Sequence, residues 1–141
     1  MKVAVRYQSR GGNTKAVAEA IAKVAGVKAE PIGVALDETV DILFVGGGVY
    51  AWTIDNSLKE YLENLNMETV KSVAAFTTGG GMSKTDKIIE IAKRKGINVC
   101  DKTLPVKMGT HNYHLFGGKG EATLSDKKIS LINDFVKETI D

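Results

Sequence analysis

Apolar segments of strand length alternate along this chain with segments of helical periodicity, and this alternation most constrains the fold. The expected strands are residues 3–7, 27–32, 42–46, 73–77 and a run that begins at 97 and extends to 106. Strand–helix alternation within one domain predicts a parallel sheet joined by right-handed crossovers, with helices on both faces. We therefore expect an α/β fold arranged as a three-layer α/β/α sandwich.

The expected helices have apolar residues at helical spacing and suitable residues at their ends. The first covers residues 14–25 and stops at Gly26, where a C-terminal glycine belongs. Asp55 is the expected cap of the second helix, and Ser83-Lys-Thr-Asp86 can form a capping box for the third. Ser125 is the expected cap of the last helix.

Length and composition limit the classes of protein to consider. The chain has 141 residues, which fits a single domain spanning residues 1–141. Its formal net charge of +2 is far below the basic density of a nucleic-acid-binding protein, so no nucleic-acid partner is expected. The single cysteine, Cys100, is expected to be a half-buried free thiol in a reducing compartment. We find no signal peptide and no apolar run approaching ~20 residues, so we expect a cytoplasmic location and no membrane partner.

The loop after the first expected strand has the features of an anion site. Its sequence, Gln-Ser-Arg-Gly-Gly-Asn-Thr, spans residues 8–14 and opens the first helix. Free backbone N–H groups and the helix dipole face the same spot there, and Ser9, Asn13 and Thr14 add side-chain donors. The loop completes neither a triphosphate-binding motif nor G-x-G-x-x-G, so the expected ligand is a phosphomonoester. An ordinary strand-to-helix turn is the alternative interpretation.

Two further loops follow expected strands and lie at the same edge of the sheet, where ligands of such folds bind. Residues 46–54, Gly-Gly-Gly-Val-Tyr-Ala-Trp-Thr-Ile, place Tyr50 and Trp52 after a glycine run. A planar aromatic ligand needs such a ring to stack on and backbone amides at its rim, although either aromatic alone could simply pack over a helix. Residues 77–82, Thr-Thr-Gly-Gly-Gly-Met, offer hydroxyls and bare backbone. Agreement among three loops predicts a ligand site more strongly than one motif does.

The motifs Ser-x-x-Gly-Asn-Thr, Gly-x-x-Val-Tyr-Ala and Thr-Thr-Gly-Gly together resemble the FMN-binding loops of the flavodoxin family. The resemblance covers essentially the whole chain, including Phe-Gly-Gly-Lys-Gly at residues 116–120. It is to the short-chain type, which has an uninterrupted fifth strand. The resemblance implies five parallel strands in the order 2-1-3-4-5, with FMN as the cofactor.

The resemblance also implies that each of the three loops contacts a different part of FMN. The first would bind the FMN phosphate, Tyr50 would stack on the flavin, and the third would line the pyrimidine side of the ring. The implied cofactor-binding residues are Ser9, Arg10, Gly11, Gly12, Asn13, Thr14, Val49, Tyr50, Ala51, Trp52, Thr77, Thr78, Gly79 and Gly80. Arg10 is included because it flanks the first loop, although solvated surface charge is the preferred interpretation of its side chain.

Three features of the sequence depart from the family pattern. Gly11 stands where Thr or Ser is usual, and the missing hydrogen bond is worth about 0.5–1.5 kcal/mol. Ala51 stands where Gly is frequent, because the peptide there flips to bond flavin N5. If that flip demands positive φ, Ala51 costs about 1–2 kcal/mol more than Gly. The third loop lacks a second stacking aromatic, which leaves one flavin face open unless Trp52 or Tyr113 covers it.

The resemblance implies a redox protein whose chemistry belongs to the bound flavin. We prefer an electron-transfer carrier with redox proteins as its partners. The alternatives are a small FMN-dependent reductase acting on a quinone or another planar substrate, and a flavodoxin-like domain without a redox role. No residue has the pattern of a general acid or base, so no catalytic residue is assigned. His111 and His114 have no third ligand at suitable spacing, so no metal site is expected.

Overall fold

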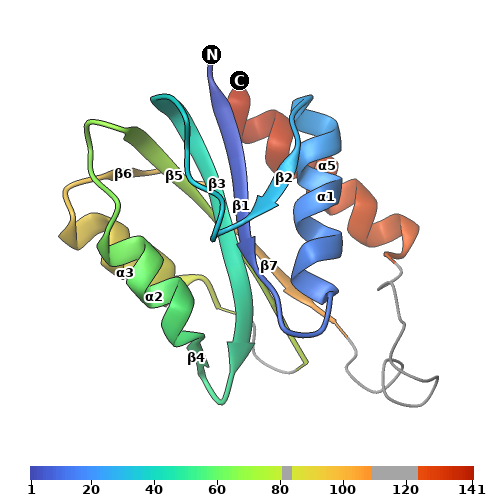
Figure 1. Ribbon diagram of the computed structural model, residues 1–141. Helices are drawn as coiled ribbons and strands as arrows, with labels where there is room; N and C mark the ends of the chain where they lie inside the picture. The colour runs from blue at the N-terminus through green and yellow to red at the C-terminus, as the bar shows by residue number, and fades with distance from the viewer. Residues whose placement is uncertain (81–83, 109–123) are drawn as a thin grey trace.

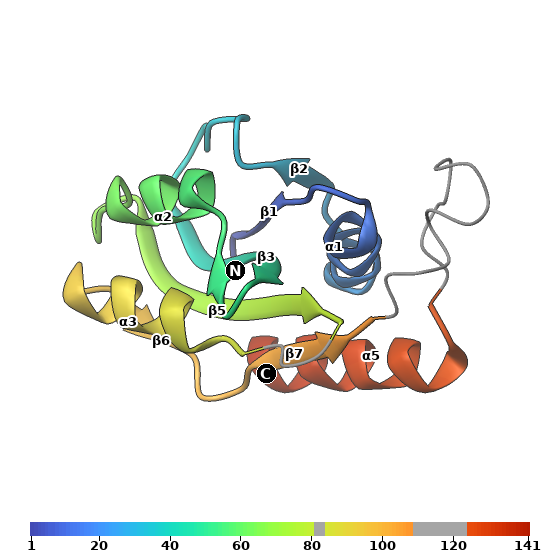
Figure 2. The ribbon, with the colours of Figure 1, turned by 90° about the horizontal axis from the view of Figure 1, so that it is seen from below.

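The structure is a computed structural model that describes residues 1–80, 84–108 and 124–141. Its strands are β1 (Val3–Gln8), β2 (Ala29–Pro31), β3 (Val40–Tyr50), β4 (Thr53–Ile54), β5 (Val70–Gly79), β6 (Asn98–Val99) and β7 (Leu104–Lys107). Its helices are α1 (Asn13–Ala25), α2 (Asn56–Glu63), α3 (Asp86–Arg94) and α5 (Asp126–Ile140). Helices α1 and α5 cover one face of the sheet, and α2 and α3 cover the other (Figures 1 and 2). The predicted three-layer α/β sandwich is confirmed.

The strands pair in the order β2-β1-β3-β5-β6, and all pairs along this path are parallel. This is the expected order 2-1-3-4-5 with one difference in numbering, because the short β4 is inserted after β3. The sheet has two strands more than the five expected. These are β4, which pairs with β3, and β7, which pairs with β5. The order of the parallel strands is confirmed.

The central strand β3 is buried on both faces, which explains its apolar sequence. Leu43 and Val45 belong to the core under α2 and α3, whereas Ile42 and Phe44 belong to the core under α1 and α5. The Phe44 ring meets Phe135 of α5 edge to face, with ring centroids 5.6 Å apart. Alternate residues of one strand therefore join both helical layers to the sheet.

The expected uninterrupted fifth strand is wrong, because that position is divided between β6 and β7. Val99 pairs with Val73, and Leu104 pairs with Phe76. Between these two pairs the outer chain advances by five residues and β5 by three, so two residues exceed what the ladder can hold. Residues 101–103 consequently leave the sheet, after a last hydrogen bond from the Cys100 N–H to the Val73 carbonyl of β5 over 2.8 Å. Cys100, at the start of this excursion, is a half-buried free thiol as predicted.

The helix ends follow local capping rules with one exception. Asp55 caps α2 by accepting from the Ser57 N–H, and Ser125 caps α5 by accepting from the Lys128 N–H. Gly26 closes α1 with φ of 76°. The predicted capping box of α3 is wrong, because Thr85 is the N-cap residue and α3 begins at Asp86. Asp86 therefore cannot occupy the third helical position that the box requires.

Candidate functional site

Three parallel strands end together at one edge of the sheet, the lower edge in Figure 1, and their ends form a cavity. Gln8 of β1 pairs with Gly47 of β3, and Gly48 of β3 pairs with Thr78 of β5. The cavity between them, here called the loop cavity, measures about 300 Å³. It is lined by Ser9, Arg10, Gly11, Asn13, Thr14, Gly48, Val49, Tyr50, Thr78, Gly79 and Gly80. All three loops that the sequence singles out contribute to it.

The first loop is held in shape by hydrogen bonds within the protein. Gly12 is the N-cap residue of α1 and has φ of 100°, a conformation that glycine adopts without strain. Its N–H donates to the Ser9 hydroxyl over 2.9 Å. No side chain in the described part of the chain caps α1, which leaves the start of this helix facing the cavity without a capping carboxylate or hydroxyl. Such a terminus favours an anion.

The first and third loops are joined by a buried hydrogen bond between two hydroxyl groups. The Thr14 and Thr78 Oγ1 atoms lie 2.7 Å apart, and both residues are almost completely buried. The sequence separates these residues by 64 positions. The contact therefore fixes the N-terminal turn of α1 against the end of β5.

Tyr50 lies at the second loop, and its ring is folded back over the strand that carries it. A β-carbon added to Gly48 would overlap the hydroxyl end of the Tyr50 ring. Because Gly48 has no side chain, the ring can lie directly against the backbone of β3. Gly48 lines the cavity but was not among the predicted binding residues, although the Gly46–Gly48 run was a visible signal for a close approach.

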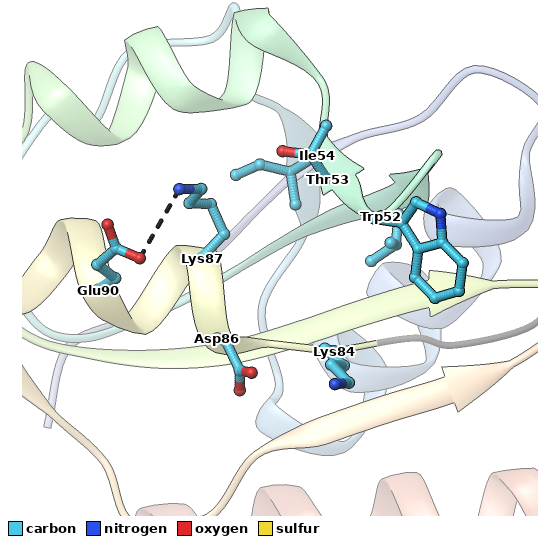
Figure 3. Close-up of a pocket in the computed structure, with 8 residues that line it drawn as sticks. Trp52, Thr53, Ile54, Lys84, Asp86, Lys87 and Glu90 are labelled. Atoms are coloured by element: carbon cyan, nitrogen blue, oxygen red, sulfur yellow. Dashed lines mark ion pairs between the residues drawn. The ribbon is translucent and has the colours of Figure 1, made fainter.

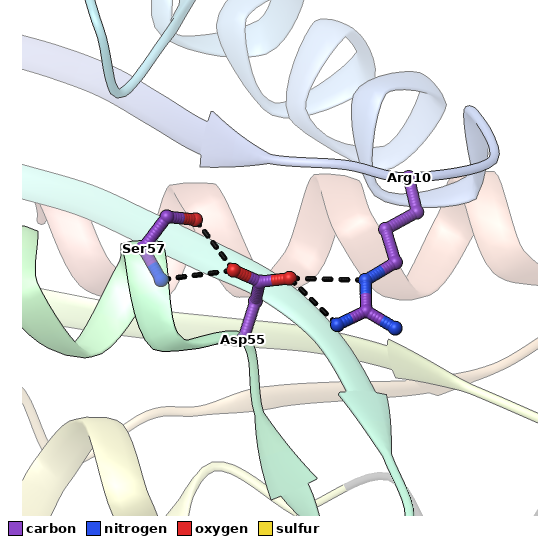
Figure 4. Close-up of polar contacts among 3 residues, drawn as sticks. All are labelled: Arg10, Asp55 and Ser57. Atoms are coloured by element: carbon purple, nitrogen blue, oxygen red, sulfur yellow. Dashed lines mark hydrogen bonds and ion pairs between the residues drawn. The ribbon is translucent and has the colours of Figure 1, made fainter.

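Arg10 extends across the opening between the first and second loops (Figure 4). Its guanidinium carbon lies 3.9 Å from the centroid of the Tyr50 ring, within cation–π distance. Arg10 Nε and one terminal nitrogen donate to a single oxygen of Asp55, over 2.9 and 2.7 Å. Arg10 is exposed, as the preferred sequence interpretation of a surface charge implies, but its guanidinium also has defined partners on another loop, which the sequence did not indicate.

Asp55 receives hydrogen bonds on both carboxylate oxygens. The oxygen turned away from Arg10 accepts from the Ser57 hydroxyl over 2.6 Å and from the Ser57 N–H over 2.8 Å. The Ser57 hydroxyl bond, the Ser57 N–H bond and the Arg10 bond together lower the pKa of Asp55 from 3.8 to about 2. Asp55 is therefore ionised throughout the ordinary pH range, so the Arg10–Asp55 contact is an ion pair there.

The second loop is a tight hairpin rather than the long loop expected. Strand β3 continues to Tyr50, and Tyr50 pairs with Thr53 of the antiparallel strand β4. The two residues between them, Ala51 and Trp52, have φ of 48° and 74°. Positive φ at both central positions is the pattern of a two-residue hairpin turn, usually made by Asn-Gly or Gly-Gly. Both side chains are exposed, and 77% of Trp52 is accessible.

On the other side of this hairpin lies a smaller cavity of about 170 Å³, here called the hairpin cavity (Figure 3). Its lining residues are Val49, Trp52, Thr53, Ile54, Lys84, Asp86, Lys87 and Glu90. Val49 lines both cavities. The Thr53 hydroxyl oxygen is buried without a hydrogen-bond partner in the described part of the chain.

Ten of the fourteen predicted residues line the loop cavity, and four do not. Gly12 supports the loop from its N-cap position, whereas Thr77 is fully buried in β5 one position before the lining residue Thr78. Ala51 and Trp52 form the hairpin turn. Ala51 is exposed and lines neither cavity, whereas Trp52 lines the hairpin cavity. The predictions for Tyr113, His111, His114 and residues 116–120 lie outside the described residues.

With this geometry in place, comparison with known proteins assigns the chain to a family. A sequence profile of the flavodoxin domain matches residues 4–132. The chain belongs to the flavodoxin family. A search of curated protein sequences gave no match. Membership of the flavodoxin family supports a flavin as the cofactor.

Solved structures show the same fold at low sequence identity. Oxidised flavodoxin 2 from Bacillus cereus has a TM-score of 0.74 at 15% identity, and the match covers 99% of this chain and 98% of that one. Rubredoxin oxygen:oxidoreductase from Desulfovibrio gigas also has a TM-score of 0.74 at 15% identity, but the match covers 98% of this chain and only 35% of that longer one. An apo NADH:FMN oxidoreductase has a TM-score of 0.60 at 17% identity, covering 99% of this chain and 88% of that one. In the described part of the chain no helix is long and apolar enough to cross a membrane.

Proposed function

We propose that this protein binds FMN in the loop cavity and acts as an electron-transfer carrier. The observation that carries the proposal is the convergence of three loop ends on one cavity in a member of the flavodoxin family. Each loop supplies a different kind of contact: an uncapped helix terminus, a tyrosine ring and a stretch of bare backbone. These are the contacts needed by a ligand with a phosphate at one end and a planar ring at the other.

The residues present fit FMN. The phosphate would lie at the start of α1, where Asn13 and the backbone N–H groups face the cavity. The flavin ring would lie between the second and third loops, where Gly48, Gly79 and Gly80 allow backbone groups to approach its edge. When bound, FMN would supply one- or two-electron transfer, and the protein would position it and set its electrostatic surroundings.

The first test is a titration of FMN with the apo-protein, followed by quenching of flavin fluorescence. We expect saturable quenching at micromolar concentrations. Asn13→Ala keeps a good helix former at the start of α1 and removes one donor to the phosphate. It should weaken FMN binding by about ten- to a hundredfold, since a hydrogen bond to a charged group is worth about 1.5–3 kcal/mol. Riboflavin, which lacks the phosphate, should bind both proteins equally. Absence of quenching in the unmodified protein would contradict the proposal.

One observation favours a reductase as the second candidate. The hairpin cavity is separated from the loop cavity by Val49 and has Trp52 at its mouth, so a planar substrate could lie there close to the flavin. The two functions differ in what the FMN-loaded protein does alone with NADH or NADPH and a quinone. A carrier requires a separate reductase and should show no steady oxidation of the nicotinamide. Steady turnover without a partner would support the reductase instead.

A further inference from the structure

The Arg10 side chain belongs to the first loop, but it extends away from that loop and contacts the second loop. Its guanidinium is held by Asp55 through two N–H groups and lies over the Tyr50 ring, 3.9 Å from the centroid. Neither partner belongs to the first loop. Arg10 therefore links the two loops between which the proposed ligand would enter.

This position has a consequence for the Tyr50 ring. The guanidinium occupies a face of the ring, and the hydroxyl end of the ring lies against Gly48. A flavin needs a free ring face to stack on, and stacked rings lie about 4.5–7 Å apart between centroids. A cation 3.9 Å above that face prevents a flavin from stacking on it. The flavin and Arg10 consequently compete for this face of the Tyr50 ring.

The other end of the proposed ligand offers Arg10 a better partner than the ones it has. A phosphate carries about −1.5 to −2 charges at pH 7 and presents several oxygens to a planar guanidinium. Arg10 lines the same cavity as Gly11, Asn13 and Thr14, the residues around the proposed phosphate position. Its Asp55 contact is partly exposed, with 58% of the Arg10 side chain accessible, and exposed ion pairs are weak.

We propose that Arg10 exchanges partners when FMN binds: its guanidinium leaves Asp55 and Tyr50 for the phosphate, and the vacated face of Tyr50 receives the flavin ring. The proposal rests on the proposed function. It assigns to Arg10 two opposite effects, obstruction of the ring and attraction of the phosphate. It also assigns to Asp55 the role of holding Arg10 in the obstructing position.

The two effects can be separated with two ligands. Lumiflavin has the isoalloxazine ring without ribityl chain or phosphate, so it reports only on the ring site. Arg10→Gln should tighten lumiflavin binding by about three- to tenfold, as expected for loss of contacts worth about 0.5–1.5 kcal/mol. The same variant should weaken FMN binding by about tenfold, because it removes a charge-assisted bond to the phosphate. A change of sign between two ligands is not expected of general damage to the fold.

Asp55→Asn tests the holding role without disturbing the helix, because Asn is as good an N-cap residue as Asp. It should tighten the binding of both ligands, since Arg10 is released but still present. Lys15→Gln is the matched control, since Lys15 is an exposed cation at the start of α1 that contacts neither Tyr50 nor Asp55 in the structure. It should leave lumiflavin binding unchanged.

The outcomes distinguish this inference from the function on which it rests. If the unmodified protein and all variants fail to bind FMN, both are overturned. If FMN binds but Arg10→Gln shifts FMN and lumiflavin in the same direction, or leaves lumiflavin unchanged, only the partner exchange is overturned. Lumiflavin binding that is undetectable in every variant also overturns it, because the ring site would then gain nothing from removal of the guanidinium.

Discussion

The hydroxyl oxygens of Thr14 and Thr78 lie 2.7 Å apart in the protein interior, and this hydrogen bond joins the first ligand loop to the third. Thr14 is in the first turn of α1, and Thr78 is near the end of β5. Neither strand pairing nor chain connectivity places these two loops together directly. Their relative position, and hence the width of the loop cavity, depends in part on this contact.

A double-mutant cycle with Thr14→Val and Thr78→Val measures this contact. Each single substitution leaves the other hydroxyl buried without its partner, which should lower the free energy of unfolding by about 1–3 kcal/mol. The double variant should lose less than the sum of the two, with a coupling energy of about 1 kcal/mol. Urea denaturation of the four proteins gives these values. Strict additivity would show that the two hydroxyls do not interact.

Gly46 and Gly48 should respond differently to alanine, although both lie in β3. A β-carbon at Gly46 would overlap the backbone carbonyl and ring of Phe76 in the neighbouring strand β5. The backbone cannot move aside, so Gly46→Ala should lower the free energy of unfolding by about 1–3 kcal/mol or prevent folding. At Gly48 the obstacle is the end of the Tyr50 side chain, which can rotate away. Gly48→Ala should therefore be much less destabilising in chemical denaturation, and equal losses would contradict this account.

The hairpin turn stores strain that glycine would relieve. Ala51 has φ of 48° and an exposed side chain, so its replacement removes no buried contact. Ala51→Gly should raise the free energy of unfolding by up to about 1 kcal/mol, the left-handed penalty less the extra entropy of glycine. Ala20→Gly within α1 is the control and should lower it by about 1 kcal/mol. A loss of stability in both variants would show that the turn is unstrained.

Asp55 should make a pH-dependent contribution to stability. Its pKa is about 2 in the folded protein against an ordinary 3.8, so the ionised carboxylate favours the folded state. This contribution is fully present above about pH 4 and is lost as the pH falls through about 2. The difference in unfolding free energy between the unmodified protein and Asp55→Asn should therefore shrink across this interval. Urea denaturation at several pH values tests this, and a difference that grows on acidification would contradict it.

The parallel sheet and its two helical layers could be predicted because strand and helix signals are local. The strand at residues 42–46 carries apolar side chains on both of its faces. Gly26 ends α1 through its own backbone conformation, which depends only on local sequence. The order of the strands came instead from the family resemblance. The division of the fifth strand was missed because it is a matter of register: residues 98–107 continue a strand-like pattern, but two of them exceed the matching length of β5.

The outline of the site could be predicted from the sequence, but two of its details could not, for physical reasons. The hairpin after Tyr50 has Ala51 and Trp52 in conformations that usually call for glycine or asparagine, so it carries no turn signal. Arg10 could not be assigned a partner from the sequence, because Asp55 is 45 residues away and only the fold brings the two together. Local chemistry thus indicated which loops form the site, but not which side chains contact one another across it.

The central claim is that the ends of β1, β3 and β5 together form the flavin site. The most direct test is to add FMN to the isotopically labelled protein and follow its backbone amide resonances by NMR. We predict large shifts at Gly11, Asn13, Tyr50 and Gly79, one or more residues from each loop, and negligible shifts at Lys127 and Lys128 at the start of α5. Shifts centred on the start of α5, or limited to a single one of the three loops, would contradict the account.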